Sequence, residues 1–460
     1  MNSSNGVMDK LVDYVSKART TELPPAVLLK TRHHILDTLA AMVSGSTLKA
    51  GEMAHKFARL QECGVHEAQV VASDIRLPVI PAAIVNGMMG HANETDDTNN
   101  DAGMHPGCAI LPAALAMAER QGASGSDLIR AVALGYDVGA RINKSLGGRR
   151  VMRERGTLTF SIGGTMGAAA AAGSLSGFTT SNQYRFLFSY AAQQASGILN
   201  YIVDTEHVEK AFTFGGMPAR NGVTAATFVQ AGFSGVLDVF SGDVTFFDAF
   251  THSERPAKPE VLIAELGSRF EVMNTNIKKY SAGFPLQSPL EGFLALAAEH
   301  RFKPDDIEKI VARMRKSGAD TVNDSDMPDL NIQYLFAVAL LDGRVSFAAG
   351  HDHHRMHAPE IRALAPRIVA VFDPAIPEES HRSIVEVTLK DGRTLSKDVA
   401  SFRGKADNPL DTDEVEAKAR DLFGTVFKPA QTEQLIEGVR GLEQVKKVSD
   451  LCRLLAKRGG

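Results

Sequence analysis

The feature that most constrains the fold of this chain is a change in hydrophobic periodicity about 60% of the way along it. Up to about residue 270 the apolar residues recur at helical spacing, as in residues 25–44. Residues 106–120 and the small-residue run 163–177 are also expected to be helices, and Ser126 is a candidate N-cap for the helix between them. The first part of the chain is therefore expected to be helical.

Beyond that point the pattern becomes that of strands. Residues 307–314 and 367–373 alternate with β-branched side chains, as half-buried strands do. Residues 383–400 have the pattern of a hairpin with Asp391-Gly392 at its turn. Helical spacing returns after about residue 411.

A chain of 460 residues is long enough for two domains. The simplest interpretation is a mainly α protein whose large all-helical domain is discontinuous, comprising residues 1–270 and 404–460. A smaller α+β domain, residues 271–403, is inserted between these parts, and the strands are expected to be confined to it.

Composition excludes several classes of function. The formal net charge of −4, with 23% charged residues, offers no basic excess for nucleic acid or an anionic membrane. No apolar run reaches the roughly 18 residues of a membrane span, and no signal peptide is expected. The cysteines Cys63, Cys108 and Cys452 are too scattered for a disulfide framework or an iron–sulfur cluster. We expect a cytoplasmic protein.

The strongest candidate for chemistry is the segment HANETDDTNNDAGMHPG, residues 91–107. It contains six titratable side chains, which are His91, Glu94, Asp96, Asp97, Asp101 and His105. Crowded carboxylates raise one another's pKa and can orient a histidine, which suits acid–base work near neutral pH. The alternative is a solvated acidic loop that caps helices.

Two further segments carry cations that could bind an anion. In EKAFTFGGMPARNG, Lys210 and Arg220 flank glycines that allow close backbone approach. In residues 277–293, Lys278 and Lys279 lie near the expected domain boundary, where clefts form. The alternatives are an ordinary helix connection and a solvated linker.

Two other features lie in the inserted region. Tyr334 begins an apolar helix, where its hydroxyl either faces a cleft or is satisfied by backbone. The segment GHDHHRMH holds four histidines at positions 351, 353, 354 and 357, which suggest either a zinc site or an exposed loop. It lacks a partnering motif such as H-E-x-x-H.

Taken in order, these segments resemble the MmgE/PrpD family. The resemblance rests on H-A-x-x-x-D-D-T followed by H-P, and on LLKTRHHILDTLAAMVSG, ALGYDVGARI, GGTMGAAAAAG, KAFTFGGMPARNG, IKKY, IQYLFAVALLDG and VTLKDGRTLSKDVASFRGKADNPLD. It spans nearly the whole chain. The resemblance implies a large helical domain, a smaller α+β lid, and an active site in the cleft between them.

The resemblance also assigns candidate residues. Family active-site positions fall on Glu94, Thr98, His105, Lys210, Lys278 and Tyr334. Decarboxylase-like members have aspartate at the position of Glu94. A family histidine corresponds to Ser161, and another is replaced within Gln287-Ser288.

These positions lead to a hypothesis about roles. His105 is the candidate acid/base, oriented by Glu94 or Asp96, while Lys210 and Lys278 hold substrate carboxylates. Further candidates for hydrogen bonding or substrate binding are Thr98, Ser161, Arg220, Lys279 and Tyr334.

The expected activity is that of a lyase needing neither cofactor nor metal. It would act beside a carboxylate of a small di- or tricarboxylic acid, as a hydratase or dehydratase of the 2-methylcitrate dehydratase type. Epimerisation and decarboxylation are the alternatives within the family. A metal-dependent hydrolase using the histidines of 351–357, or a non-catalytic anion-binding relative, are alternatives of other classes.

The first testable prediction concerns assembly. The family resemblance implies a homodimer, and a long helical domain offers many apolar faces for one. Light scattering of the purified protein at micromolar concentration is expected to give twice the 49.4 kDa chain mass. A monomeric mass would contradict this prediction.

Overall fold

The computed structural model describes residues 6–148, 156–157, 159–251 and 256–457. The chain forms two compact units, of which unit 1 is Met1–Asn276 with Val415–Gly460 and unit 2 is Ile277–Glu414. Helix accounts for 59% of the structure and strand for 9%, which confirms the expected mainly α fold class with a smaller α+β part.

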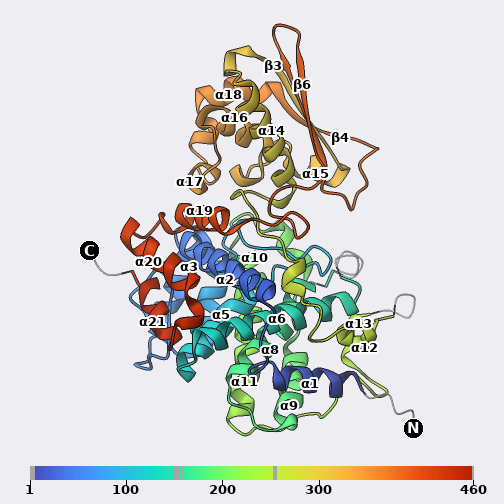
Figure 1. Ribbon diagram of the computed structural model, residues 1–460, viewed down its shortest axis with the longest axis vertical. Helices are drawn as coiled ribbons and strands as arrows, with labels where there is room; N and C mark the ends of the chain where they lie inside the picture. The colour runs from blue at the N-terminus through green and yellow to red at the C-terminus, as the bar shows by residue number, and fades with distance from the viewer. Residues whose placement is uncertain (1–5, 149–155, 158, 252–255, 458–460) are drawn as a thin grey trace. The chain divides into compact units, whose positions relative to one another are not determined.

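Unit 1 is built from helices (Figure 1). They are α1 (Val7–Lys17), α2 (Pro25–Gly45), α3 (Lys49–Leu60), α4 (Val79–Gly90), α5 (Pro106–Gln121), α6 (Gly125–Ser145), α8 (Thr159–Leu175), α9 (Ser181–Gln194), α10 (Val208–Ala211), α11 (Met217–Gln230), α12 (Phe246–Phe250), α13 (Pro259–Ile263), α19 (Thr412–Phe423), α20 (Pro429–Arg440) and α21 (Val448–Cys452). A π-helical segment, η2 (Phe212–Gly216), joins α10 directly to α11. The helices expected from periodicity are confirmed as α2, α5 and α8.

Helix α8 is central to unit 1, where it packs against α5, α6, α9 and α11 (Figure 1). Its small residues permit this. A Cβ added at Gly167 would lie 2.6 Å from the carbonyl oxygen of Gly135 in α6, so the two backbones are in direct contact. Close packing of this kind excludes water without large side chains.

The prediction that Ser126 caps α6 is wrong. Ser124 is the N-cap, because its side chain accepts from the Asp127 amide while the Asp127 side chain accepts from the Ser124 amide. This reciprocal capping box satisfies two amides that the first helical turn leaves unpaired. Ser126 lies inside the first turn, and its hydroxyl donates to the Glu443 carbonyl.

A second close contact positions the π-helical segment. A Cβ at Gly215 would lie only 2.0 Å from the carbonyl oxygen of Gly87 in α4. Helix α4 leads directly into the loop that begins at His91. The Gly87–Gly215 contact therefore holds η2 itself against the C-terminal part of α4.

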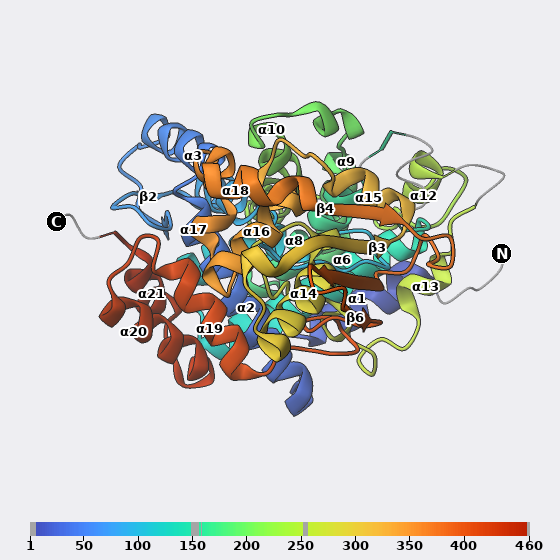
Figure 2. The same ribbon diagram turned by 90° about the horizontal axis from the view of Figure 1, so that it is seen from above.

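Unit 2 combines a four-stranded sheet with helices. Its strands are β3 (Ile307–Met314), β4 (Ile368–Phe372), β5 (Ser383–Leu389) and β6 (Thr394–Val399), and its helices are α14 (Gln287–His300), α15 (Lys316–Val322), α16 (Ile332–Asp342), α17 (Phe347–Gly350) and α18 (Pro359–Leu364). The strand order is β4-β3-β5-β6, with β3 parallel to β4 and the other pairs antiparallel. Figure 2 shows β4, β3 and β6 in that order across the sheet.

The strands predicted from alternation are confirmed as β3, β4 and the β5–β6 hairpin. Alternate residues of β5 are buried, which is the period of two that the sequence displays. The hairpin turns at Asp391-Gly392, and Gly392 has the positive φ of +89° that this turn requires. Helices α14 and α16 pack against each other and on the sheet.

Strands are not confined to the inserted region, contrary to the prediction. In unit 1, β1 (Ala68–Gln69) pairs antiparallel with β2 (Arg76–Leu77). Each of these strands has only two residues, which is too short for an alternation of apolar and polar side chains to be recognised in the sequence.

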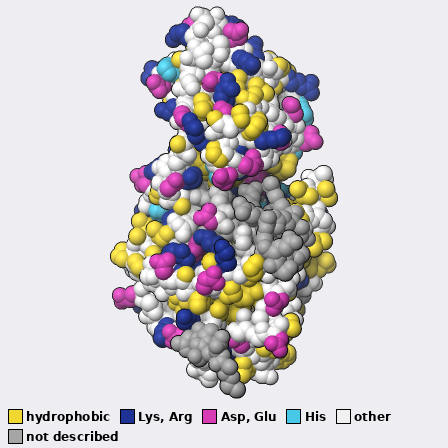
Figure 3. Space-filling view, turned by 90° about the vertical axis from the view of Figure 1, so that its right-hand side faces the viewer, with side chains coloured by type: hydrophobic (Ala, Val, Ile, Leu, Met, Phe, Trp, Pro, Cys, Tyr) yellow, Lys and Arg dark blue, Asp and Glu magenta, His cyan; other side chains and the backbone are white. Residues whose placement is uncertain are grey.

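The surface mixes side chains of different kinds. Lysine and arginine are interspersed with aspartate and glutamate on the face in Figure 3. No helix in the described ranges is at once long and apolar enough to span a bilayer.

The Gly87–Gly215 contact leads to a prediction about stability. Gly215→Ala should lower the free energy of unfolding by at least about 2 kcal/mol, because the new methyl group overlaps backbone that cannot move aside. Chemical denaturation monitored by circular dichroism measures this.

Gly438→Ala in α20 is the matched control. There the new Cβ would meet only the Leu451 Cδ1 at 3.0 Å, the end of a flexible side chain. Because alanine favours helix over glycine by about 1 kcal/mol, this variant should be neutral or stabilised. Equal effects at the two positions would contradict the proposed contact.

Candidate active site

The loop between α4 and α5 is anchored by Asp97, whose carboxylate is buried. It accepts hydrogen bonds from His34 Nδ1 at 2.6 Å and from the Tyr136 hydroxyl at 2.6 Å. It also accepts from the Gly107 amide at 2.9 Å, in the first turn of α5. Donors from α2, α6 and α5 therefore fix one carboxylate, and with it the loop.

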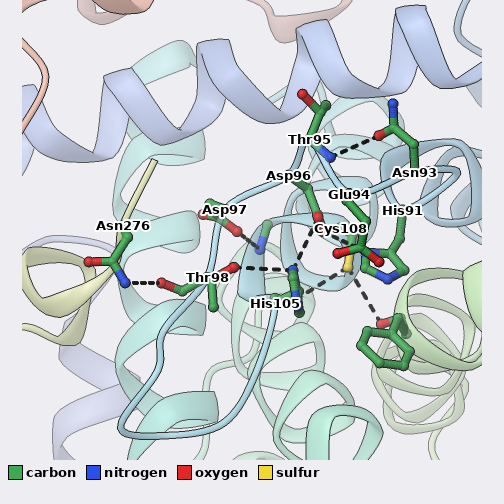
Figure 4. Close-up of polar contacts among 12 residues, drawn as sticks. His91, Asn93, Glu94, Thr95, Asp96, Asp97, Thr98, His105, Cys108 and Asn276 are labelled. Carbon is green, nitrogen blue, oxygen red and sulfur yellow. Dashed lines mark hydrogen bonds and ion pairs between the residues drawn. The ribbon is translucent and has the colours of Figure 1, made fainter. Parts of the chain in front are cut away.

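Its neighbour Asp96 is also buried and lies between two histidines (Figure 4). Its Oδ2 accepts from His91 Nδ1 at 2.8 Å, and its Oδ1 accepts from His105 Nδ1 at 3.1 Å. The Thr98 hydroxyl lies 3.4 Å from the same His105 nitrogen. With Nδ1 occupied in this way, Nε2 is the nitrogen of His105 that is placed to exchange a proton.

The protonation state of Asp96 differs from the expectation for crowded carboxylates. Burial alone would raise its pKa, but the charge of His105 and the hydrogen bonds from both imidazoles hold the pKa of Asp96 well below its usual range. Burial lowers the pKa of His91 to about 4, so this imidazole is neutral and still donates its Nδ1 proton. Asp96 is thus an ionised acceptor that orients both rings.

Glu94, in the same loop, forms an ion pair with a lysine from α10. Lys210 Nζ, from α10, contacts Glu94 Oε1. Burial alone would lower the pKa of Lys210, but the Glu94 carboxylate outweighs it and raises that pKa. Lys210 therefore keeps its positive charge inside the protein.

Aromatic packing joins this pair to the histidines. The Phe214 ring, from η2, stacks on His91 with centroids 4.4 Å apart, and Lys210 Nζ lies 5.5 Å from its centroid. The ring of His105 lies 5.6 Å from those of Phe214 and Phe160. The structure thus brings together five predicted residues of unit 1, which are Glu94, Asp96, Thr98, His105 and Lys210.

Sequence reasoning missed His207, which lies in this cluster. Its ring centroid is 5.3 Å from that of His91. Its spacing of three residues before Lys210, at the start of a helix, was a usable signal. The partners of Asp97, His34 and Tyr136, had no comparable local signal because they are 63 and 39 residues away.

Two predicted residues of unit 1 have other partners. The Ser161 hydroxyl is buried and donates to the Thr213 carbonyl at 2.8 Å. Arg220 donates to the Asn221 side chain at 2.9 and 3.0 Å, and its guanidinium lies 5.8 Å from the Phe212 ring. These contacts give both side chains a role in packing around η2.

The remaining predicted residues belong to unit 2. Lys278 is fully buried, and Lys279 pairs with Glu414 at 3.2 Å. Tyr334 donates its hydroxyl to the Ala349 carbonyl at 2.6 Å, and burial raises its pKa to about 12. Convergence of Lys278 and Tyr334 with His105 stays a prediction.

The histidines of 351–357 do not form a metal-compatible group within the described ranges. His351 stacks on Phe347 at 4.2 Å, while His353, His354 and His357 are exposed. Two metal-compatible groups occur elsewhere, His91–Asp96–His105 and His91–Glu94–His207. These observations favour the exposed-loop interpretation of 351–357.

Comparison with known proteins identifies the family. The family model for the MmgE/PrpD N-terminal domain matches residues 9–258, which is more than half of the chain. The chain belongs to the MmgE/PrpD family. The model for the MmgE/PrpD C-terminal domain matches residues 280–444, so both parts of this MmgE/PrpD protein are recognised.

Relatives match over almost their whole lengths. A cis-aconitate decarboxylase-like protein of Aspergillus oryzae is 26% identical over 481 residues, covering 98% of this chain and 97% of its own. Human cis-aconitate decarboxylase is 26% identical over 451 residues, covering 94% and 91%. The Aspergillus terreus cis-aconitate decarboxylase is 24% identical over 486 residues, covering 99% and 96%.

The anchoring role of Asp97 is testable. Asp97→Asn should lower the free energy of unfolding by about 2–4 kcal/mol. The asparagine side chain has only one oxygen, so its NH₂ group would face a hydrogen-bond donor that now donates to the Asp97 carboxylate. Thermal and chemical denaturation measure the change. Asp101→Asn, at an exposed position of the same loop, should stay within about 0.5 kcal/mol of the parent. A stable Asp97→Asn variant would show that the anchor is dispensable.

Proposed function

We propose that this MmgE/PrpD protein is a carboxy-lyase that acts on a small di- or tricarboxylic acid. Family membership and the relatives support an enzyme that processes a carboxylic acid. The sequence favoured a hydratase or dehydratase. The relatives support the alternative, decarboxylation, better than 2-methylcitrate dehydration, since they are named as cis-aconitate decarboxylases.

The observation that carries this proposal is a charged lysine and an oriented histidine that both lie near the Phe214 ring. Lys210 remains protonated although its side chain is only 20% exposed, because the Glu94 carboxylate compensates its charge. His105 is held by Asp96 at Nδ1, and its side chain is 11% exposed, whereas His91 is fully buried. The site thus combines a cation for a carboxylate with one histidine that a substrate can reach.

These groups match what decarboxylation requires. When the C–C bond to a carboxylate breaks, carbon dioxide leaves and the electron pair stays on the neighbouring carbon. A second carboxylate delocalises this pair, and a fixed cation such as Lys210 stabilises the developing charge in a site that excludes water. Protonated His105 then donates the proton of its Nε2, which forms the new C–H bond, and solvent restores the proton.

The reaction can be identified directly by mass spectrometry. The purified enzyme is incubated in deuterated water with a panel of di- and tricarboxylates, including cis-aconitate. Loss of carbon dioxide with one deuteron on the product carbon is the expected result. Gain or loss of water would overturn the proposal in favour of a hydro-lyase. Incorporation of deuterium without loss of carbon dioxide and without gain or loss of water would overturn it in favour of an epimerase.

The roles of His105 and Lys210 separate in steady-state kinetics. His105→Ala should lower kcat by about 10²–10⁴-fold with little change in KM, as loss of a positioned proton donor does. Lys210→Ala should raise KM and lower kcat, because its charge meets both the bound carboxylate and the developing anion.

Asp101→Asn, in the same loop but exposed, is expected to keep full activity. Near-normal turnover by His105→Ala on a verified substrate would exclude His105 as the proton donor.

A further inference from the structure

Two buried histidine nitrogens near the site have no hydrogen-bond partner among the residues that the structure describes. They are His91 Nε2 and His207 Nε2. His91 is fully buried and His207 is 9% exposed. A buried polar atom without a partner is unfavourable, because it has lost its hydrogen bonds to water. Other buried side-chain atoms of the described residues also lack partners, but these two belong to one cluster.

The two imidazoles converge on a carboxylate. One ligating atom from each of His91, Glu94 and His207 can be chosen so that all three lie within 4.8 Å of one another. Bonds of about 2.0–2.1 Å to a tetrahedral zinc ion place ligand atoms about 3.3 Å apart. Small side-chain rotations would therefore close the three groups around one ion. In Figure 4 the Glu94 carboxylate lies beside the His91 ring.

The orientation of His91 is already that of a metal ligand. Its Nδ1 donates to Asp96 Oδ2 at 2.8 Å, and its plane is fixed by the stacked Phe214 ring at 4.4 Å. A carboxylate on Nδ1 fixes the tautomer in which Nε2 carries a lone pair, and metal-binding histidines commonly have this outer partner. Because a lone pair and a carboxylate both accept, a cation would suit both groups.

The other metal-compatible group, His91–Asp96–His105, needs no ion. Its members already satisfy one another through the hydrogen bonds of Asp96. In the group with His207, the Nε2 atoms of both histidines lack a hydrogen-bond partner within the described ranges. Its two nitrogens and one carboxylate are donors suited to zinc, cobalt or nickel rather than to magnesium or calcium.

We propose that His91 Nε2, His207 Nε2 and the Glu94 carboxylate form a binding site for a divalent transition-metal ion such as Zn²⁺. Lys210 also contacts Glu94, so its ammonium opposes the ion electrostatically. The site goes beyond the proposed decarboxylation and does not depend on it, since metal binding is measured without a substrate.

The test is a titration of the full-length, chelator-stripped protein with ZnCl₂ by isothermal titration calorimetry. One ion per chain is expected, with Co²⁺ visible absorption as a second readout of nitrogen ligation. His207→Asn should weaken binding by at least about 10–100-fold, the effect usual even for an outer-shell partner. His207 has a φ of +59°, which asparagine tolerates, so this variant keeps the backbone conformation.

Three further variants sharpen the result. Glu94→Gln keeps the side-chain size and should also weaken binding, which preserves the test if His207→Asn is unstable. Lys210→Met should strengthen binding by removing the opposing charge. His354→Asn, an exposed histidine of the 351–357 loop, should bind zinc as the parent does.

The proposal is overturned by any of three results. These are the absence of saturable zinc binding, unchanged binding by both His207→Asn and Glu94→Gln, or a loss of binding in His354→Asn. The last would place the ion in the 351–357 loop. Decarboxylase activity does not enter these outcomes, so failure of the metal site and failure of the proposed function are distinguishable.

Discussion

The candidate site depends on the burial of one negative charge, that of Asp97. A buried carboxylate is unfavourable unless several donors surround it. Here the donors come from α2, α6 and the first turn of α5, so the carboxylate links three separate helices. Because Asp97 is held in this way, the adjacent Asp96 is directed to the two histidines. The same dipeptide therefore supplies both the anchor and the group that orients His105, the proposed acid/base.

The lysine reaches this loop through contacts between small residues. Helices α5 and α11 both pack on α8, and the Gly87–Gly215 contact brings η2 against α4. Residues before and after the loop are thus fixed relative to Lys210 and Phe214. Single-turn π-helical segments are frequent at functional sites. Here the segment directs Phe214 onto His91, which places an aromatic face under the lysine.

The sequence predicts well those features that are local or periodic. Apolar spacing predicts helices α2, α5 and α8 and the strands of unit 2. Asp391-Gly392 predicts the turn of the β5–β6 hairpin. What it misses depends on competition or distance. Ser124 is the N-cap of α6 in place of Ser126, because Ser124 and Asp127 each accept a hydrogen bond from the other's backbone amide. His34 and Tyr136 meet Asp97 only through folding. His207, by contrast, is the N-cap of α10 three residues before Lys210, so its place in the site was open to prediction.

The choice of acid/base follows from exposure and partners rather than from residue type. Three histidines cluster in unit 1, and two of them, His91 and His207, are buried. At the position where the family resemblance places a further histidine, Ser161 gives its hydroxyl to the Thr213 carbonyl. A proton donor has to reach the substrate directly or through one water. Among the three clustered rings, that requirement selects His105, since Asp96 holds its Nδ1 and its side chain remains partly exposed.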